Sequence, residues 1–470
     1  MSRIRNPGLA VWLAPALAGC TTVGPDYHVP ARAVANAPAA QAAFHEAGPG
    51  TANDPLPPRW WHLYDDAVLD DLEQQALAAN TDLRIAGANL ARARAVVAGA
   101  ESARQPEFGI SLEAERARLS GESFLLTQPL PVANLGDATA GASYQIDLFG
   151  QIRRSVEAAR ADAAASEATV NAVKVTLAAD VARAYLGQCA AGEALDLVQQ
   201  AVTIDRRALD IAKRMHAAGR ASVSEVTRAQ ARLAQVEAIV PIQHARSRAA
   251  LYRLAYLLGR PPSAYPRSAE RCNTVPTITH PLPVGDGATL IARRPDVHVA
   301  ERQLAAATAR IGVATAALYP HVGIGLSGGS FGFLKDLGTA PANTWSIGGL
   351  IQWSVPTGGA RARVRATDAE ADAALARFDA VVLGALRDTE TALATYAEDH
   401  NRTVALAQVR EAAEREAAET RAMRDAGRSP LSASIGAAQT TMSARLAEAG
   451  GREAVAFDQV NLFLALGGGW

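Results

Sequence analysis

The sequence predicts an all-α barrel of long helices joined to a membrane-spanning β-barrel, with four strands supplied by each chain. Apolar and small polar residues alternate with a period of two at about residues 107–116, 139–148, 321–328 and 344–355. Helical periodicity covers most of the remaining chain in unusually long stretches. Spanning barrels have at least about eight strands, and an open sheet edge in lipid leaves backbone groups without hydrogen bonds. The chain is therefore expected to form oligomers.

The stretch 344–355 shows the strand pattern most clearly. Its odd-numbered positions form an apolar stripe that includes Trp345 and Trp353, and its even-numbered positions are small or polar except for Leu350. Such alternation suits a strand with lipid on one face and water on the other. A half-buried strand of a soluble sheet has the same pattern, but the very long helices favour the barrel. The positions expected to line its lumen are Ser143, Gln145, Asp147, Ser346 and Gln352.

Composition limits the possible partners and locations. The chain has 470 residues and a formal net charge of −1, which gives no reason to expect nucleic acid as a partner. No run of eighteen apolar residues occurs, so a helical protein of the inner membrane is not expected.

Residues 1–19 are predicted to be a signal peptide. Arg3 and Arg5 precede a short apolar run, and 17–20 read Leu-Ala-Gly-Cys. That tetrapeptide resembles the bacterial lipobox, in which the cysteine, here Cys20, receives acyl groups that anchor the mature chain to a membrane. Thr21 follows, and by the bacterial sorting pattern a residue other than Asp directs the protein to the outer membrane. The alternative is an ordinary signal peptide with an incidental Cys20.

Residues 20–64 are expected to be an extended, lipidated tether. This stretch is rich in Pro, Ala and Gly and has no sustained periodicity. Trp60 and Trp61 are expected to pack its end against the body of the protein.

Two copies of one plan fill the rest of the chain, at 65–259 and 286–470, with a mid-tube linker at 260–285. Each copy is predicted to contain a helix that ends before a proline, two strands, one very long helix, a Gly-Arg pair and a returning helix. The predicted helices are 81–104, about 153–218 and about 221–258 in the first copy, and 295–318, about 361–426 and about 430–466 in the second.

Helix lengths predict how the copies are arranged. A helix over 153–218 is about 99 Å long, and helices over 81–104 and 221–258 together reach about 93 Å. Two short helices can therefore stack beside one long helix, which gives four helical columns per chain. Three chains would supply twelve strands and twelve columns, so we expect a homotrimer. The seam expected on the second long helix is Ala371, Leu375, Phe378, Val382, Ala385, Thr389, Leu393 and Tyr396.

Several motifs together resemble the TolC-type outer-membrane factors, and in particular their NodT-like efflux lipoproteins. These motifs are 17–20, Val-Gly-Pro-Asp-Tyr at 23–27, Leu-Gly-Arg-Pro-Pro at 258–262, Arg-Arg-Pro-Asp-Val at 293–297, Ala-Glu-Arg at 300–302 and the ending at 465–470. The resemblance implies a trimeric channel with a twelve-stranded barrel in the outer membrane and a helical tunnel in the periplasm. It also implies a periplasmic adaptor and an inner-membrane pump of the RND or MFS type as partners.

The resemblance also suggests where the partners bind. Similar proteins contact the adaptor at the tips where the long helices turn back, which correspond here to Gly219, Arg220, Gly427 and Arg428. The alternative is that these residues are simple helix-capping glycines and solvated arginines.

A pore gate is expected just beyond the second tip. Relatives carry acidic residues shortly before an Ala-Gln or Ala-Thr pair, and these acids ring the pore. The matching positions here are Ser434 and Ala437, which are uncharged. The hypothesis for this chain is that cation selectivity is weaker or that Asp425 supplies the charge.

Cys189 and Cys272 are expected at similar heights along the tube. Cys189 lies on the first long helix and Cys272 follows the first returning helix. In an oxidising periplasm the two can form a disulfide, with two free thiols as the alternative.

Catalytic motifs are lacking. The sequence has no HExxH or CxxC motif, and the Gly-x-Gly-x-x-Gly at 323–328 is not followed by a helical pattern. We therefore expect no enzyme activity, no cofactor and no metal. The predicted function is a passive efflux conduit for drugs or toxic compounds, and the alternative is the exit duct of a type I protein secretion system.

Overall fold

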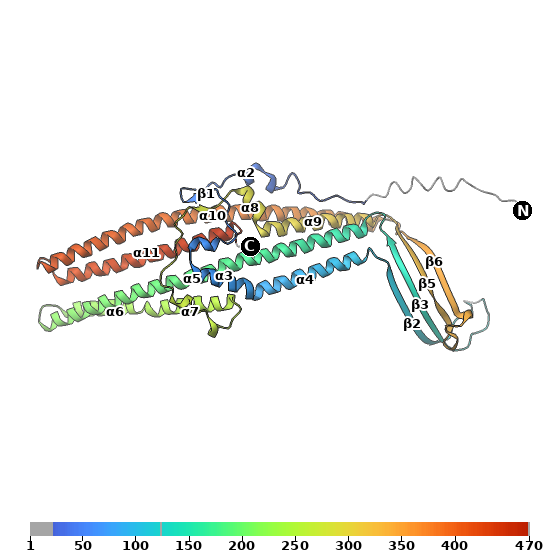
Figure 1. The fold of residues 1–470 in the computed structure, drawn as a ribbon, viewed down its shortest axis with the longest axis horizontal. Helices are drawn as coiled ribbons and strands as arrows, with labels where there is room; N and C mark the ends of the chain where they lie inside the picture. Colours follow the sequence, from blue (N-terminus) through green and yellow to red (C-terminus); the bar gives the residue numbers. More distant parts are fainter. Residues whose placement is uncertain (1–21, 123–124, 469–470) are drawn as a thin grey trace. The chain divides into compact units, whose positions relative to one another are not determined.

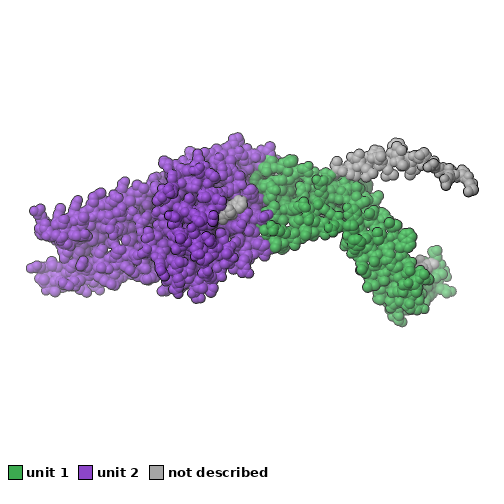
Figure 2. All heavy atoms as spheres, viewed as in Figure 1, with its two compact units in different colours: residues 1–30, 90–166, 300–378 green, residues 31–89, 167–299, 379–470 purple. Residues whose placement is uncertain are grey.

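The computed structural model describes residues 22–122 and 125–468 and divides the chain into two compact units (Figures 1 and 2). Unit 1 comprises residues 1–30, 90–166 and 300–378, and unit 2 comprises 31–89, 167–299 and 379–470. The predicted signal peptide 1–19 and the predicted lipidation site Cys20 lie outside the described residues.

Unit 1 contains one antiparallel sheet with the strand order β2-β3-β5-β6. The strands are β2 Glu107–Ala117, β3 Ala133–Ile146, β5 His321–Phe333 and β6 Asn343–Gln352. All four predicted strands exist, but β3 begins earlier and β5 ends later than the alternation indicated. β6 ends before Trp353, and Pro356 nearby lacks the N–H that a ladder requires.

Four helices contribute residues to both units: α4 Thr81–Ser102, α5 Gln151–Ala217, α9 Pro295–Ala316 and α10 Gly358–Asp425. Asn80 caps α4, because its Oδ1 accepts hydrogen bonds from the N–H groups of Asp82 at 2.9 Å and Leu83 at 3.0 Å. Local signals of this kind explain why the predicted helix starts agree with the structure to within about three residues.

Unit 2 places the remaining helices beside the two long ones (Figure 1). They are the short α2 Pro38–Gln41, α3 Ala67–Ala79, α6 Val223–Glu237, α7 Val240–Leu257, α8 Gly287–Arg293 and α11 Leu431–Ala465. Arg206 on α5 pairs with Glu237 at 2.8 Å, and Arg452 on α11 pairs with Glu193 on α5. Arg410 on α10 pairs with Glu448 on α11 at 2.7 Å. α11 therefore lies between α5 and α10.

The prediction of a single returning helix over 221–258 is wrong. The helix is interrupted at Ala238 and Ile239, between α6 and α7. Pro241 explains the break, because it has no N–H to donate and its ring crowds the carbonyl group four residues earlier, that of Glu237. The second returning helix has no internal proline and is continuous as α11.

Six of the eight residues in the predicted seam on α10 are buried, and Ala371 and Tyr396 at its ends are partly buried. Phe378, Val382, Ala385, Thr389 and Leu393 are each at most 2% exposed. Their spacing of three and four residues follows one face of the helix, as a packed seam requires.

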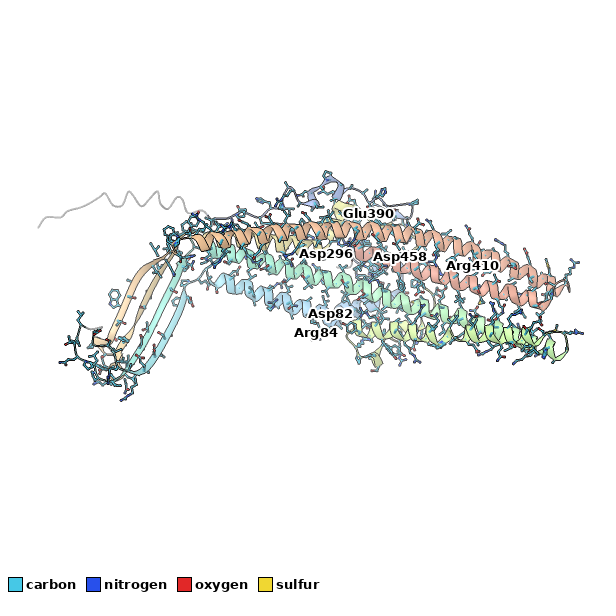
Figure 3. All side chains as sticks on the ribbon, turned by 180° about the vertical axis from the view of Figure 1, so that it is seen from behind. Asp82, Arg84, Asp296, Glu390, Arg410 and Asp458 are labelled. Atoms are coloured by element: carbon cyan, nitrogen blue, oxygen red, sulfur yellow. A yellow bond between two sulfur atoms is a disulfide. The ribbon has the colours of Figure 1, made fainter. Side chains whose placement is uncertain are left out.

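Residues 31–64 follow the body of unit 2. The N–H groups of His45 and Glu46 donate to the carboxylate of Glu390 at 2.8 and 3.0 Å, a residue labelled in Figure 3. The strand β1 Thr51–Ala52 pairs in parallel with β4 Leu282–Pro283. Trp60 is fully buried with its ring 4.8 Å from that of Phe463, so this segment ends in a packed contact, as expected.

Across the described ranges, every helix is too short or too polar to cross a membrane.

Candidate functional site

The register of the sheet sorts its side chains into alternating rows. Residues opposite one another in an antiparallel pair lie on the same face. One row contains Phe108, Ala142, Leu326 and Ile347, and the next contains Gly109, Gly141, Ser327 and Ser346. The predicted alternation within each strand therefore extends across all four strands.

One face of the sheet is apolar and open. Phe108 and Ile110 on β2 are 80% and 82% exposed, and Trp345 and Ile347 on β6 are 81% and 75% exposed. A contiguous exposed surface of large apolar side chains is unusual for a chain in water and marks contact with lipid or protein.

The opposite face is polar and lines a hollow of about 730 Å³. Ser143 and Ser346 both line this hollow, and the hydroxyl oxygen of Ser346 lies 2.9 Å from that of Ser327. Gln145 and Gln352 belong to the same face by register, where Gln145 lies opposite Gly323 and Gln352 opposite His321. The structure therefore brings four of the five predicted lumen residues to one face.

Asp147 is different, and its predicted place in a strand is wrong. β3 ends at Ile146, and the carboxylate of Asp147 accepts hydrogen bonds from the N–H groups of Ile152 at 3.0 Å and Arg153 at 2.8 Å. The side chain therefore caps the start of α5. Asp147 directly follows the last residue of the strand, so its polar side chain still fits the alternation. The alternation therefore cannot show that the strand has already ended and that this residue caps a helix.

Both outer strands of the sheet leave one edge unpaired within the described part of the chain. β2 pairs only with β3, and β6 pairs only with β5. Edge strands carry free N–H and C=O groups that can pair with another chain.

The two Gly-Arg tips have the same helix-ending geometry. Gly219 and Gly427 adopt φ values of +70° and +68°. The N–H groups of Arg220 and Arg428 donate to the carbonyl groups of Met215 and Met423, each at 2.8 Å. These bonds form Schellman caps, and the side chains of both arginines are exposed. The caps account for both glycines, and a docking role for either tip stays a prediction.

Two of the three expected gate residues, Asp425 and Ser434, both contact Arg424, and Ala437 is packed separately. Asp425 pairs with the guanidinium of the adjacent Arg424 at 2.6 Å, and Arg424 lies 3.5 Å from the hydroxyl of Ser434. Ala437 is 5% exposed, and its carbonyl accepts from the Thr441 hydroxyl at 2.9 Å. The charge of Asp425 is therefore offset locally.

Cys189 and Cys272 form a disulfide in the structure, with a Cα–Cα distance of 4.6 Å. Cys189 lies on α5 and is fully buried, and Cys272 lies in the linker between α7 and β4. The bond ties the linker to the long helix.

A second cavity, of about 560 Å³, lies in unit 2 and was not expected from the sequence. Its lining includes Arg183 on α5, Asp296 on α9, Arg387 on α10 and Asp458 on α11; Asp296 and Asp458 are labelled in Figure 3. Asp458 is 8% exposed, and one of its oxygens has no hydrogen-bond partner among the described residues. Burial raises its pKa to about 6, with a smaller contribution from the charge of Asp399.

The signal for this residue was present in the sequence but weak. Asp458 interrupts the apolar face of α11 within a run of buried positions that ends at Phe463 and Ala465. A charged residue at a buried helical position is unusual.

No group of three or more His, Cys, Asp or Glu side chains within 22–122 and 125–468 could hold a metal ion. The glycines at 323, 325 and 328 lie in the middle of β5, so the dinucleotide-binding turn that their spacing matches is not formed.

A family model described as outer membrane efflux protein matches residues 72–260 and 288–468. The chain belongs to this family. The match begins within α3 and ends just after α11.

Individual relatives of this efflux-family chain align over nearly its whole length. It is 29% identical over 475 residues to nodulation protein T of Rhizobium leguminosarum bv. viciae, which covers 98% of this chain and 93% of the relative. It is 27% identical over 473 residues to outer membrane protein OprJ of Pseudomonas aeruginosa, with 99% and 97% covered.

Solved structures show the same fold. The outer-membrane channel OprN is 31% identical and matches with a TM-score of 0.87 over 96% of this chain and 100% of that one. The outer membrane protein VceC of Vibrio cholerae is 24% identical, with a TM-score of 0.78 over 88% and 99%, and supports the fold alone. Because the relatives are outer-membrane channels and efflux proteins, the predictions of family and of a non-enzymatic conduit are confirmed.

Proposed function

We propose that three copies of this chain form a passive conduit across the outer membrane for drugs or toxic small molecules. One observation supports the proposal most strongly. The four-stranded sheet has an exposed apolar face, a polar face that lines a hollow, and two open edges. A closed barrel of several such sheets would direct the apolar face to lipid and enclose the polar face.

Closure of the barrel requires β6 of one copy to pair with β2 of the next. Three copies supply twelve strands, and the exposed edges then have partners. The long helices of the same three copies would continue the bore as a helical tube in the periplasm. Anchoring by acyl groups on Cys20 would hold the assembly to the outer-membrane lipid.

Transport through the conduit needs no chemistry from this chain. Ser143, Gln145, Ser346 and Gln352 would keep the barrel bore hydrated, and a wide wet path makes few selective contacts. A pump of the inner membrane, of the RND or MFS type, would supply the energy, and a periplasmic adaptor would join it to the tips at Gly219, Arg220, Gly427 and Arg428.

The gate is proposed in the turn between α10 and α11. Ser434 and Ala437 carry no charge, and Arg424 offsets Asp425. We therefore expect the channel to be less selective for cations than one ringed by free acidic residues. Reversal potentials of the wild type and of Asp425→Ala should be nearly equal, and a clear loss of cation selectivity in the variant would contradict this view.

A deletion strain tests the function directly. Sensitivity to a panel of antibiotics, dyes and detergents should rise in the strain and return to normal when the wild-type chain is restored. Unchanged sensitivity across the panel would reject drug efflux. Loss of one large protein from the culture medium, with unchanged sensitivity, would instead support the exit duct of a type I secretion system.

A further inference from the structure

A basic groove of about 490 Å³ lies in unit 1, away from the polar face of the sheet. It is formed by the N-terminal segment at Asp26 and Tyr27, the end of α4, the first turns of α5 and the middle of α9. Five arginines line it: Arg104, Arg153, Arg154, Arg160 and Arg302.

Three of these arginines already have carboxylate partners. The Arg154 side chain is 4% exposed and pairs with both Asp26 and Glu157 at 2.8 Å. Arg160 pairs with Glu101 at 2.5 Å, and Arg302 pairs with Glu301. These pairs build the walls of the groove.

Close contacts with α5 and α9 fix the N-terminal segment that forms one wall of the groove. Arg154 donates to the carbonyl of Gly24 at 3.0 Å, and its hydrogen bond to Asp26 keeps the pKa of that carboxyl below its ordinary value. Gly24 has a φ of +87°, and a Cβ there would lie 2.4 Å from the Cα of Gly312. Only glycine fits this approach, so the groove is formed before any ligand arrives.

Arg104 and Arg153 are the two arginines left for a ligand. Within the described ranges neither guanidinium forms an ion pair; that of Arg153 donates to the hydroxyl of Thr22 at 3.3 Å and lies near enough to Asp26 to help lower the pKa of that carboxyl. Both side chains are exposed. Two unpaired guanidinium groups at one groove favour an anion with several acceptor oxygens, such as a phosphate.

Arg104 lies next to the apolar sheet, and Arg153 lines the same groove. Arg104 precedes Phe108, the first large residue of the exposed apolar face, by four positions. Four residues of extended chain span at most about 14 Å. If the sheet crosses the membrane as proposed above, this places the guanidinium groups close to the lipid headgroups, which lie just outside the hydrocarbon core.

We propose that this groove binds the phosphate of an anionic phospholipid in the leaflet next to the helices. This inference depends on the proposed function in one respect, which is that the sheet must lie in a membrane. Basic pockets beside membrane-spanning segments are a common means of binding anionic lipid headgroups. The apolar face that begins at Phe108 would receive the acyl chains, which distinguishes a lipid from a free anion.

Native mass spectrometry of the purified full-length protein in detergent tests the site. The probes are phosphatidylglycerol, phosphatidylcholine with the same acyl chains, and inorganic phosphate. The wild type should bind phosphatidylglycerol about 10-fold more tightly than phosphatidylcholine. The double variant Arg104→Gln/Arg153→Gln should lose most of this preference and keep its binding of phosphatidylcholine.

Arg363→Gln/Arg365→Gln is the matched control. These two arginines lie in the first turns of α10, are exposed, and are not part of the groove. The control should keep the full preference. Equal losses in both double variants, no preference in the wild type, or displacement of the lipid by an equal concentration of phosphate would each overturn the proposal.

Conductance in bilayers of phosphatidylcholine alone separates this site from the proposed function. Both double variants should still form channels there, which shows that they fold and insert. A wild type that prefers phosphatidylglycerol but conducts no ions would reject the conduit and retain the lipid site.

Discussion

Asp458 is a carboxyl group whose surroundings oppose its ionisation. Its folded-state pKa is about 6, above the ordinary value of 3.8, because burial and the charge of Asp399 disfavour the carboxylate. Between these two pH values the folded chain binds more protons than the unfolded chain, so stability falls as pH rises. The contribution of this carboxyl group to the stability of the folded chain is fully present below about pH 4 and is lost as the pH rises above about 6.

Asp458→Asn should therefore stabilise the protein at neutral pH. Asparagine keeps the shape of the side chain without the charge, so the variant should exceed the wild type by about 1 kcal/mol in unfolding free energy at pH 7.5. The gain should vanish by pH 4. Unfolding by denaturant at a series of pH values measures it. Asp388→Asn, which removes a half-exposed partner of Arg387, is the control and should show no such gain.

Sequence reasoning worked for individual residues where a short-range pattern determines their position. Ser143 and Ser346 share one face of the sheet, as alternation with a period of two predicts, and their place in a lumen stays a prediction. Asp147 was misplaced because a strand end and a helix cap favour the same polar residue. Asp458 and the groove at Arg153 were missed because their surroundings come from elements far apart in the sequence.

Secondary-structure elements could be predicted where their ends are marked locally. α5 and α10 end at Gly-Arg pairs, and both glycines have the left-handed conformation that the sequence indicated. The break between α6 and α7 was missed because periodic positions continue on both sides of Pro241. The short helices α3 and α8 were also missed, although Asp66 and Asp286 cap their first turns.

The disulfide should contribute substantially to the stability of unit 2. It links residues separated by 83 positions, and closing a loop of that length restricts the unfolded chain. Replacing both Cys189 and Cys272 by alanine should lower the unfolding free energy by about 3 to 4 kcal/mol. Denaturant unfolding measures the loss, and the reduced wild type should match the double variant. Equal stability of the oxidised wild type and the variant would contradict this account.

The proposed arrangement of several chains rests on the faces and edges of the sheet. The register across β2, β3, β5 and β6 gives a sheet with two different faces. Its unpaired edges require a partner in lipid. The proposed number of copies rests on closure of the barrel, which is a property of the assembly and not of one chain.

Adjacent residues on β6 provide the sharpest test of the assembled barrel. Ile347 is on the apolar face and Ser346 is on the polar face, in the middle of the same strand. A lysine at 347 would have to face the hydrocarbon core, at a cost of about 2 to 4 kcal/mol per chain. A lysine at 346 would face the water-filled bore.

We therefore expect Ile347→Lys to prevent assembly and Ser346→Lys to permit it. Membrane fractionation and native electrophoresis should show few oligomers of the first variant and normal amounts of the second. In single-channel recordings, Ser346→Lys should shift the selectivity toward anions, because three added positive charges would line the bore. Normal assembly of Ile347→Lys together with failure of Ser346→Lys would mean that the two faces of the sheet are assigned the wrong way round.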